Sequence, residues 1–193
     1  MELIGQIVGL QVQRSSLKVG ERRRYDPAPL RSLAALTLSA DGVTGCAEDG
    51  AQILDVHNRM HPGSKNVKGI NGVSVGFTAH YAAMRARFGP HLTDGIAGEN
   101  ILVAADQQVA RESLAGGLLI RGGEGSGVRL VRVLIAEPCL EFSRYAERLP
   151  TDAPPDGVVR EALQFLREGM RGYYASLEGE PGVVRLGDSV YRL

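Results

Sequence analysis

The sequence predicts a mainly β protein, built as a barrel or closed sheet with a few helices attached to it. Two observations lead to this fold class. Short runs with strand-like composition outnumber the segments with helical spacing, and glycine-rich turns separate one run from the next. The chain of 193 residues is long enough for one sizeable core or for two small lobes. We therefore expect one domain over residues 1–193, with a C-terminal helix and strands (about residues 156–193) packing on the barrel.

The strands of the N-terminal half are predicted from short apolar runs that are bounded by turns. Residues 39–42 form a clear turn signal, and three glycines close to Cys46 indicate a glycine-spaced loop around that thiol. Apolar residues alternate loosely or carry β-branched side chains in the runs at residues 1–13, 33–38, 51–56 and 72–77.

Two segments have helical spacing. Residues 78–88 begin with Thr78, a suitable N-cap, and are followed by Gly89, a typical helix stop. Residues 156–169 carry the stronger apolar stripe, formed by Val158, Val159, Ala162, Leu163, Phe165 and Leu166. We expect two helices at these places.

The strands of the C-terminal half follow from the same signals. A glycine turn over residues 94–98 leads into a strand that starts near residue 101. Residues 114–120 and 128–135 are expected to be neighbours across a glycine-rich turn, and short strands over residues 172–177 and 183–193 complete the chain.

Cys139 is the first candidate for chemistry. It follows a valine-rich run, and Pro138 cannot donate to a sheet, so the thiol is placed where a strand gives way to a loop. Such a thiol is a nucleophile, a metal ligand or a small buried side chain, and burial is the commoner state of a free cysteine.

Three polar stretches are the other candidates. Residues 14–24 are basic and form either a solvated loop or an anion-binding arm. His57 and His61 are four residues apart, but Pro62 opposes the helix that a metal pair would need, which favours a surface loop. Glu99 and Asn100 stand at the entrance of a strand, where polar side chains tie down backbone amides.

Composition excludes several classes of function. The formal net charge is zero, which argues against a general nucleic-acid binder. No apolar run approaches the ~18 residues of a membrane span. Two cysteines make no disulfide framework, and we expect both to be reduced thiols in a cytoplasmic protein.

Four short motifs, in this order, resemble those of the MOSC domain family, which occurs at the C-terminus of eukaryotic molybdenum cofactor sulfurases and as small stand-alone bacterial proteins. The resemblance covers most of the chain. The motifs are Gly98-Glu99-Asn100-Ile101, Pro138-Cys139, Gly169-Met170-Arg171-Gly172-Tyr173-Tyr174 and Gly187-Asp188.

The resemblance implies a closed β-barrel of the MOSC type, similar to the barrel of pyruvate kinase. It also implies that Cys139 carries sulfur or ligates molybdenum of the molybdenum cofactor. The cofactor carries a phosphate and needs cationic donors, for which Lys18, Arg22 and Lys65 are the candidates, with Glu99 and Asn100 at the rim. Arg144 is a further cation that would favour a Cys139 thiolate.

The expected reaction is sulfur transfer through a persulfide, with a cysteine desulfurase as partner, or reduction of N-hydroxylated compounds with a redox partner. The alternative is a binding module that holds a phosphorylated or sulfurated small molecule without turning it over. Pyridoxal phosphate is associated with the family, but no Schiff-base lysine is recognisable in this chain.

The chain departs from the family at one place. Many members have Gly-Asp, then Arg or Lys and a His, where this sequence has Gly45-Cys46-Ala47-Glu48. The loop over residues 57–66 is the candidate to replace those groups. We expect Cys139, and not Cys46, to be the reactive thiol.

Overall fold

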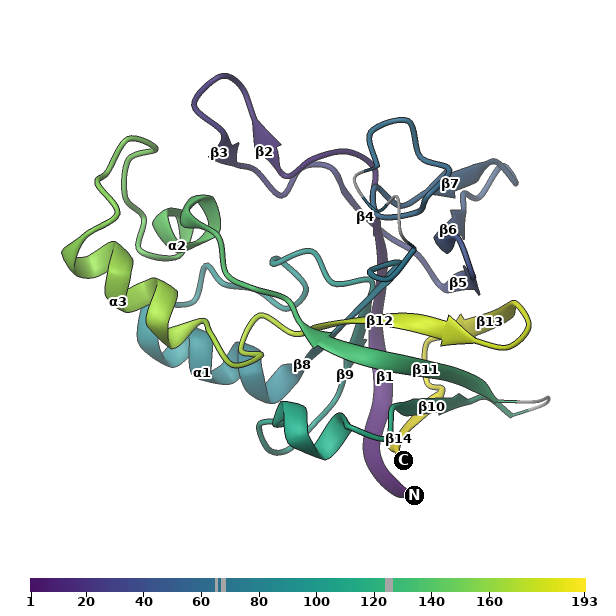
Figure 1. Cartoon of the computed structure of the whole chain (residues 1–193). Coiled ribbons are helices and arrows are strands. Elements are labelled where there is room, and N and C mark those ends of the chain that lie inside the picture. Colours follow the sequence, from purple (N-terminus) through teal and green to yellow (C-terminus); the bar gives the residue numbers. More distant parts are fainter. Residues whose placement is uncertain (65, 67–68, 124–126) are drawn as a thin grey trace.

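Seven strands close into a β-barrel in the computed structural model, which describes residues 1–64, 66, 69–123 and 127–193 (Figure 1). Hydrogen-bonded neighbours follow the order β14-β10-β11-β12-β8-β9-β1, and β1 pairs with β14 to complete the ring. Within the ring only β8 and β9 are parallel. The strands are β1 (Glu2–Gln13), β8 (Val73–Phe77), β9 (Ile101–Val103), β10 (Leu118–Arg121), β11 (Val128–Ile135), β12 (Tyr173–Glu178) and β14 (Ser189–Arg192). The closed β-barrel expected from the sequence is confirmed.

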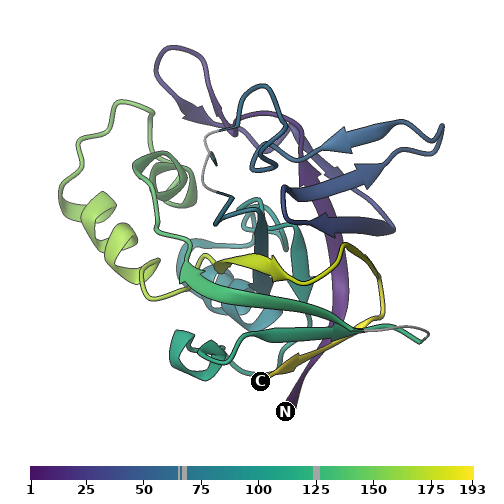
Figure 2. The same ribbon diagram turned by 45° about the vertical axis from the view of Figure 1, so that its right-hand side comes forward.

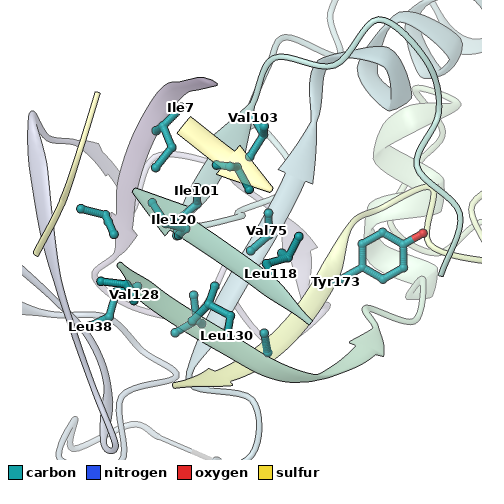
Figure 3. Packing of buried hydrophobic residues seen from close by; sticks show 14 of the residues in the cluster. Ile7, Leu38, Val75, Ile101, Val103, Leu118, Ile120, Val128, Leu130 and Tyr173 are labelled. Carbon is teal, nitrogen blue, oxygen red and sulfur yellow. The ribbon is translucent and has the colours of Figure 1, made fainter. Parts of the chain in front are cut away.

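Side chains from every barrel strand fill the interior (Figure 3). The alternation of the strands sends one set of residues inward, as β11 illustrates with buried Val128, Leu130 and Val133 between more exposed neighbours. Each such apolar side chain contributes roughly 1.5–3 kcal/mol by leaving water. The interior of the barrel is therefore a packed core.

The remaining strands form two smaller sheets and one extension of the barrel. The four-stranded sheet has the order β13-β5-β6-β7, the two-stranded β2–β3 hairpin projects from the barrel, and β4 pairs with the C-terminal part of β1. The bounds are β2 (Lys18–Val19), β3 (Arg24–Tyr25), β4 (Leu30–Ser32), β5 (Ala35–Ser39), β6 (Gly42–Cys46), β7 (Gln52–Leu54) and β13 (Gly182–Arg185).

One loop prediction is wrong in this region. Residues 42–46 were expected to be a glycine-spaced loop, but they form β6, which pairs on both sides with β5 and β7. Gly45 allows the Leu33 side chain to approach closely, because a Cβ at this position would require that side chain to move. A glycine that permits close approach gives the same sequence signal as a glycine that permits a turn.

Three α-helices and a 3₁₀ helix are present in the described residues: α1 (Thr78–Phe88), η1 (Arg111–Leu114), α2 (Leu140–Ala146) and α3 (Gly157–Phe165). The two predicted helices are confirmed as α1 and α3, although α3 ends before Gly169 because Glu168 and Gly169 take positive φ values. Thr78 is not the N-cap that we expected. Phe77 holds that position, and the Thr78 hydroxyl donates to the carbonyl of Ala105.

Helix α2 was missed from the sequence and packs against α3, while the four-stranded sheet lies on the opposite side of the barrel (Figure 2). The C-terminal strands do not all pack on the barrel from outside, since β12 and β14 are strands of the barrel itself. No helix among the described residues is both long and apolar enough to cross a membrane.

Candidate functional site

A cavity of about 280 Å³ lies at one end of the barrel, between the β2–β3 hairpin and the segment that leads into α2. Most of its wall comes from parts of the chain that are far apart in sequence. The hairpin region provides Leu17, Lys18, Arg23 and Tyr25, the segment after β7 provides Val56 and His57, the segment before β9 provides Gly98 and Glu99, the segment after β11 provides Ala136, Glu137 and Cys139, and the start of β12 provides Arg171 and Tyr174.

Cys139 lies in this wall as the residue directly before α2. Strand β11 ends at Ile135, as the nearby proline led us to expect, and the Ala136 amide then donates to the Gly172 carbonyl at 3.1 Å. This bond ties the segment that carries the thiol to the start of β12. Cys139 is partly buried, whereas Cys46 is exposed and lies on β6 outside the cavity wall.

Two cations of the hairpin meet a single carboxylate at the cavity. Lys18 Nζ lies 3.2 Å from Glu141 Oε2, and Arg23 Nε donates to Glu141 Oε1 at 2.7 Å. Burial raises the pKa of Glu141, but the hydrogen bonds from Arg23 and Lys18 outweigh it and lower that pKa to about 2. Glu141 is therefore ionised at neutral pH and fastens the hairpin to α2.

Arg171 is a third cation of the cavity; it stands in the third family motif but was not among the cations expected at the site. Its guanidinium donates to the carbonyls of Glu137 and Ala97 at 3.2 and 3.0 Å and lies 4.8 Å from the ring centroid of Phe142. Burial disfavours its charge, but electrostatic coupling to the acidic groups around it, Cys139 first and Tyr25 next, outweighs burial and raises the pKa of Arg171 above its ordinary value. The sequence signal that could have identified Arg171 is its place in Gly169-Met170-Arg171-Gly172, directly before strand β12.

Glu99 is a buried carboxyl in the same wall. Its Oε2 accepts a hydrogen bond from the Tyr81 hydroxyl at 2.6 Å, while its Oε1 has no partner among the described residues. Burial raises the pKa of Glu99. We expected Glu99 to bond backbone groups, but its hydrogen-bond partner in the structure is a tyrosine side chain.

Asn100 lies beneath the cavity and bonds backbone groups, in the manner we expected for this position. Its Oδ1 accepts from the Ser74 amide at 3.0 Å and from the Ser74 hydroxyl at 2.9 Å. Its Nδ2 donates to the Gln11 carbonyl at 3.2 Å and to Asp55 Oδ2 at 2.8 Å. Asn100 thus joins β1, β8 and the segment after β7 under the floor of the cavity.

The two histidines of residues 57–66 have separate surroundings. His57 lines the cavity, with its ring 5.6 Å from that of Tyr174, while His61 contacts the Arg14 carbonyl and accepts a hydrogen bond from the Gly63 amide. Among the described residues there is no group of three or more His, Cys, Asp or Glu side chains arranged to hold a metal ion.

Arg22 and Arg144, two cations predicted from the sequence, do not line this cavity with Lys18. The Arg22 side chain is 79% exposed, and its nearest acid is Asp152 at 3.9 Å. Arg22 and Arg144 line a second cavity of about 710 Å³, which adjoins the first and shares Arg23 and Tyr25 with it. Lys65 lies outside the described residues.

Solved structures with low sequence identity share this fold. The YuaD protein from Bacillus subtilis superposes with a TM-score of 0.57 at 15% identity, over 96% of this chain and 93% of that one. YiiM from Escherichia coli gives a TM-score of 0.50 at 15% identity, over 84% of this chain and 64% of YiiM. YiiM from Geobacillus stearothermophilus gives 0.50 at 13% identity, over 100% and 74%.

Sequence comparison assigns the family. No curated protein sequence shows significant similarity to this chain. The family described as the MOSC domain, however, matches residues 71–191, which include α1, most of the barrel strands and the Cys139 segment. MOSC domains are associated with molybdenum cofactor binding in general. The match covers more than half of the sequence, and this chain therefore belongs to the MOSC domain family.

Proposed function

We propose that the cavity next to Cys139 binds the molybdenum cofactor, with the Cys139 sulfur as the ligand of the metal. The observation that carries this proposal is the meeting of one thiol with Lys18, Arg23 and Arg171 in a single cavity. Molybdenum suits a soft thiolate, and the phosphate of the cofactor suits lysine and arginine donors.

The chemistry of the wall fits such a ligand. Arg171 Nε and Glu99 Oε1 are both buried and have no hydrogen-bond partner among the described residues. Buried polar atoms are normally satisfied, so two such atoms in the wall of one cavity support a polar ligand at this place. Lys18 and Arg23 would hold the phosphate in competition with Glu141, and Asn100 would act indirectly by fixing the floor.

Sulfur transfer is the first reaction that this site supports. The Cys139 thiolate attacks the outer sulfur of a persulfide on a cysteine desulfurase, a new sulfur–sulfur bond forms, and the desulfurase cysteine leaves as a thiolate. Lys18, Arg23 and Arg171 place positive charge at the cavity in which this exchange would take place. The bound cofactor would supply a metal that accepts sulfur and exchanges two electrons.

Reduction of an N-hydroxylated compound is the second reaction. A redox protein supplies two electrons, two protons are taken up, and the hydroxylamine becomes an amine and water. A cavity of about 280 Å³ limits the substrate to a small molecule. Both cysteines are free thiols, which supports a reducing, cytoplasmic location.

Mass spectrometry after incubation with a cysteine desulfurase and cysteine tests the first reaction. A gain of one sulfur atom on the peptide of Cys139, absent in Cys139→Ser and retained in Cys46→Ser, is the result expected for sulfur transfer. Turnover of an N-hydroxylated compound by cofactor-loaded protein and a reduced redox partner identifies a reductase. If the protein retains the cofactor but shows neither reaction, the result supports the alternative function, a non-catalytic binding module.

A further inference from the structure

Asp55 is a fully buried carboxylate that accepts four hydrogen bonds. Its Oδ2 accepts from the Gln13 amide at 2.7 Å and from Asn100 Nδ2 at 2.8 Å. Its Oδ1 accepts from the amide of His57 at 2.8 Å and lies 2.9 Å from His57 Nδ1. Because both oxygens already accept from backbone or amide donors, the short contact to the ring is one in which His57 Nδ1–H donates.

This contact fixes the tautomer of His57. A neutral imidazole carries one proton, and a proton held on Nδ1 leaves Nε2 with a free lone pair. The His57 side chain is 28% exposed and lines the cavity beside the ring of Tyr174. Among the described residues, the His57 ring makes a hydrogen bond through Nδ1 and none through Nε2.

The other three histidines are engaged or enclosed. Both ring nitrogens of His61 and of His91 have hydrogen-bond partners. His80 is buried, its Nε2 accepts from the Val109 amide, and its Nδ1 is enclosed without a partner in the described part of the chain. Of the four histidines, His57 is thus the one whose imidazole offers a bare nitrogen to a cavity.

We propose that His57 is the proton-transfer group of the Cys139 cavity, oriented by Asp55, and that the cavity takes ligands that present an O–H or N–H group to Nε2. The ligand proton passes to Nε2 while the bonding electron pair stays on the ligand, and the imidazolium remains paired with Asp55. The reverse step returns the proton. This inference rests on the proposed function only for the identity of the ligand.

The surroundings of His57 carry charges of both signs. Tyr174 packs against its ring from β12, and Asp55 holds it from below. The rest of the cavity wall brings Lys18, Arg23 and Arg171 as cations, with Glu99, Glu137 and Cys139 as acidic groups. A proton that moves to or from His57 therefore moves next to positive and negative groups of the cavity wall.

Carbethoxylation with diethyl pyrocarbonate tests the bare nitrogen without any cofactor. The reagent acylates an unprotonated imidazole nitrogen, and peptide mass spectrometry assigns the product to one of the four histidines. We expect His57 to react first, to react more slowly after N-ethylmaleimide has filled the cavity at Cys139, and to react more slowly in Asp55→Asn. If another histidine reacts first, or if blocking Cys139 has no effect, the inference is overturned.

Chemical rescue tests proton transfer in the cofactor-loaded protein, with acetohydroxamic acid as the N-hydroxylated probe. His57→Ala should lower the rate about 100-fold or more, as loss of a general acid or base does, and free imidazole should restore part of it. Cys139→Ser should not respond to imidazole. A full rate in His57→Ala refutes the inference. An inactive wild type that still shows fast carbethoxylation at His57 contradicts the proposed reduction of N-hydroxylated compounds and leaves the proton acceptor supported.

Discussion

Replacement of Asn100 by Ala should destabilise the protein more than any surface substitution. Asn100 is 1% exposed and makes four hydrogen bonds, two through each end of its amide. Removal of the amide leaves the Ser74 backbone N–H buried without its acceptor and takes one of four donors from Asp55. The side chain is also almost fully buried beneath the cavity, so alanine leaves a gap there.

The expected change in the free energy of unfolding follows from these lost hydrogen bonds. An unpaired buried donor costs about 1–3 kcal/mol, and a lost hydrogen bond to a charged group costs about 1.5–3 kcal/mol. Because bonds within one network do not add fully, we expect the free energy of unfolding to fall by about 3–5 kcal/mol. Urea unfolding, followed by circular dichroism, measures this as a lower midpoint with an unchanged slope.

Two further variants test whether the lost hydrogen bonds cause this loss of stability. Asn100→Asp keeps the volume and the acceptor for Ser74 but sets a carboxylate against Asp55, and we expect it to cost at least as much as alanine. Gln108→Ala, at an exposed position, should change stability by about 0.5 kcal/mol at most. A cost below about 1 kcal/mol for Asn100→Ala, or near-wild-type stability of Asn100→Asp, would refute the role of this network.

The remaining predictions concern neighbouring contacts. Tyr81→Phe removes the donor to Glu99 and the acceptor of a backbone amide, and should lower the free energy of unfolding by about 1–3 kcal/mol in urea. The Glu141 carboxyl has a lowered pKa of about 2, so its stabilising effect is complete above its unfolded pKa of 4.5 and is lost as the pH falls towards 2. Acid unfolding of Glu141→Gln should therefore lack this contribution between pH 4.5 and 2, and an acid transition identical to the wild type would contradict it. Gly172→Ala should be more destabilising than Gly179→Ala in the same urea assay. Both glycines have positive φ, but only at Gly172 would a Cβ lie 2.5 Å from the Val75 carbonyl oxygen. Equal losses of stability in the two variants would count against this contact.

The sequence predicts the elements whose periodic pattern is long enough to detect. Strand β1, with 12 residues, and helix α3, with its apolar stripe, are of this kind. Helix α2 has only 7 residues, about two turns, and no side-chain cap, so neither its period nor its start can be read locally. Closure of the barrel by β1 and β14 joins opposite ends of the chain, and no local pattern specifies that pairing.

In the candidate site, too, the sequence predicts some residues and not others. A cysteine after a strand and a proline predicts where Cys139 lies along the chain, but Arg22 and Arg23 have no local difference that tells which of them faces the cavity. The hairpin geometry decides this, with Arg23 at a positive φ and hydrogen-bonded to Glu141. Asp55 is hidden from sequence reasoning because its donors from β1 and from Asn100 approach only in the folded chain.

Metal and pterin analysis of protein from a host that makes the molybdenum cofactor tests the central claim most directly. Wild type and Cys46→Ser should both retain stoichiometric molybdenum and pterin, because Cys46 lies on β6 outside the cavity wall. Cys139→Ser should lose the metal while its urea midpoint stays that of the wild type, since the thiol of Cys139 is only partly buried. Molybdenum retained in full by Cys139→Ser, or lost in Cys46→Ser, would contradict the assignment of this cavity.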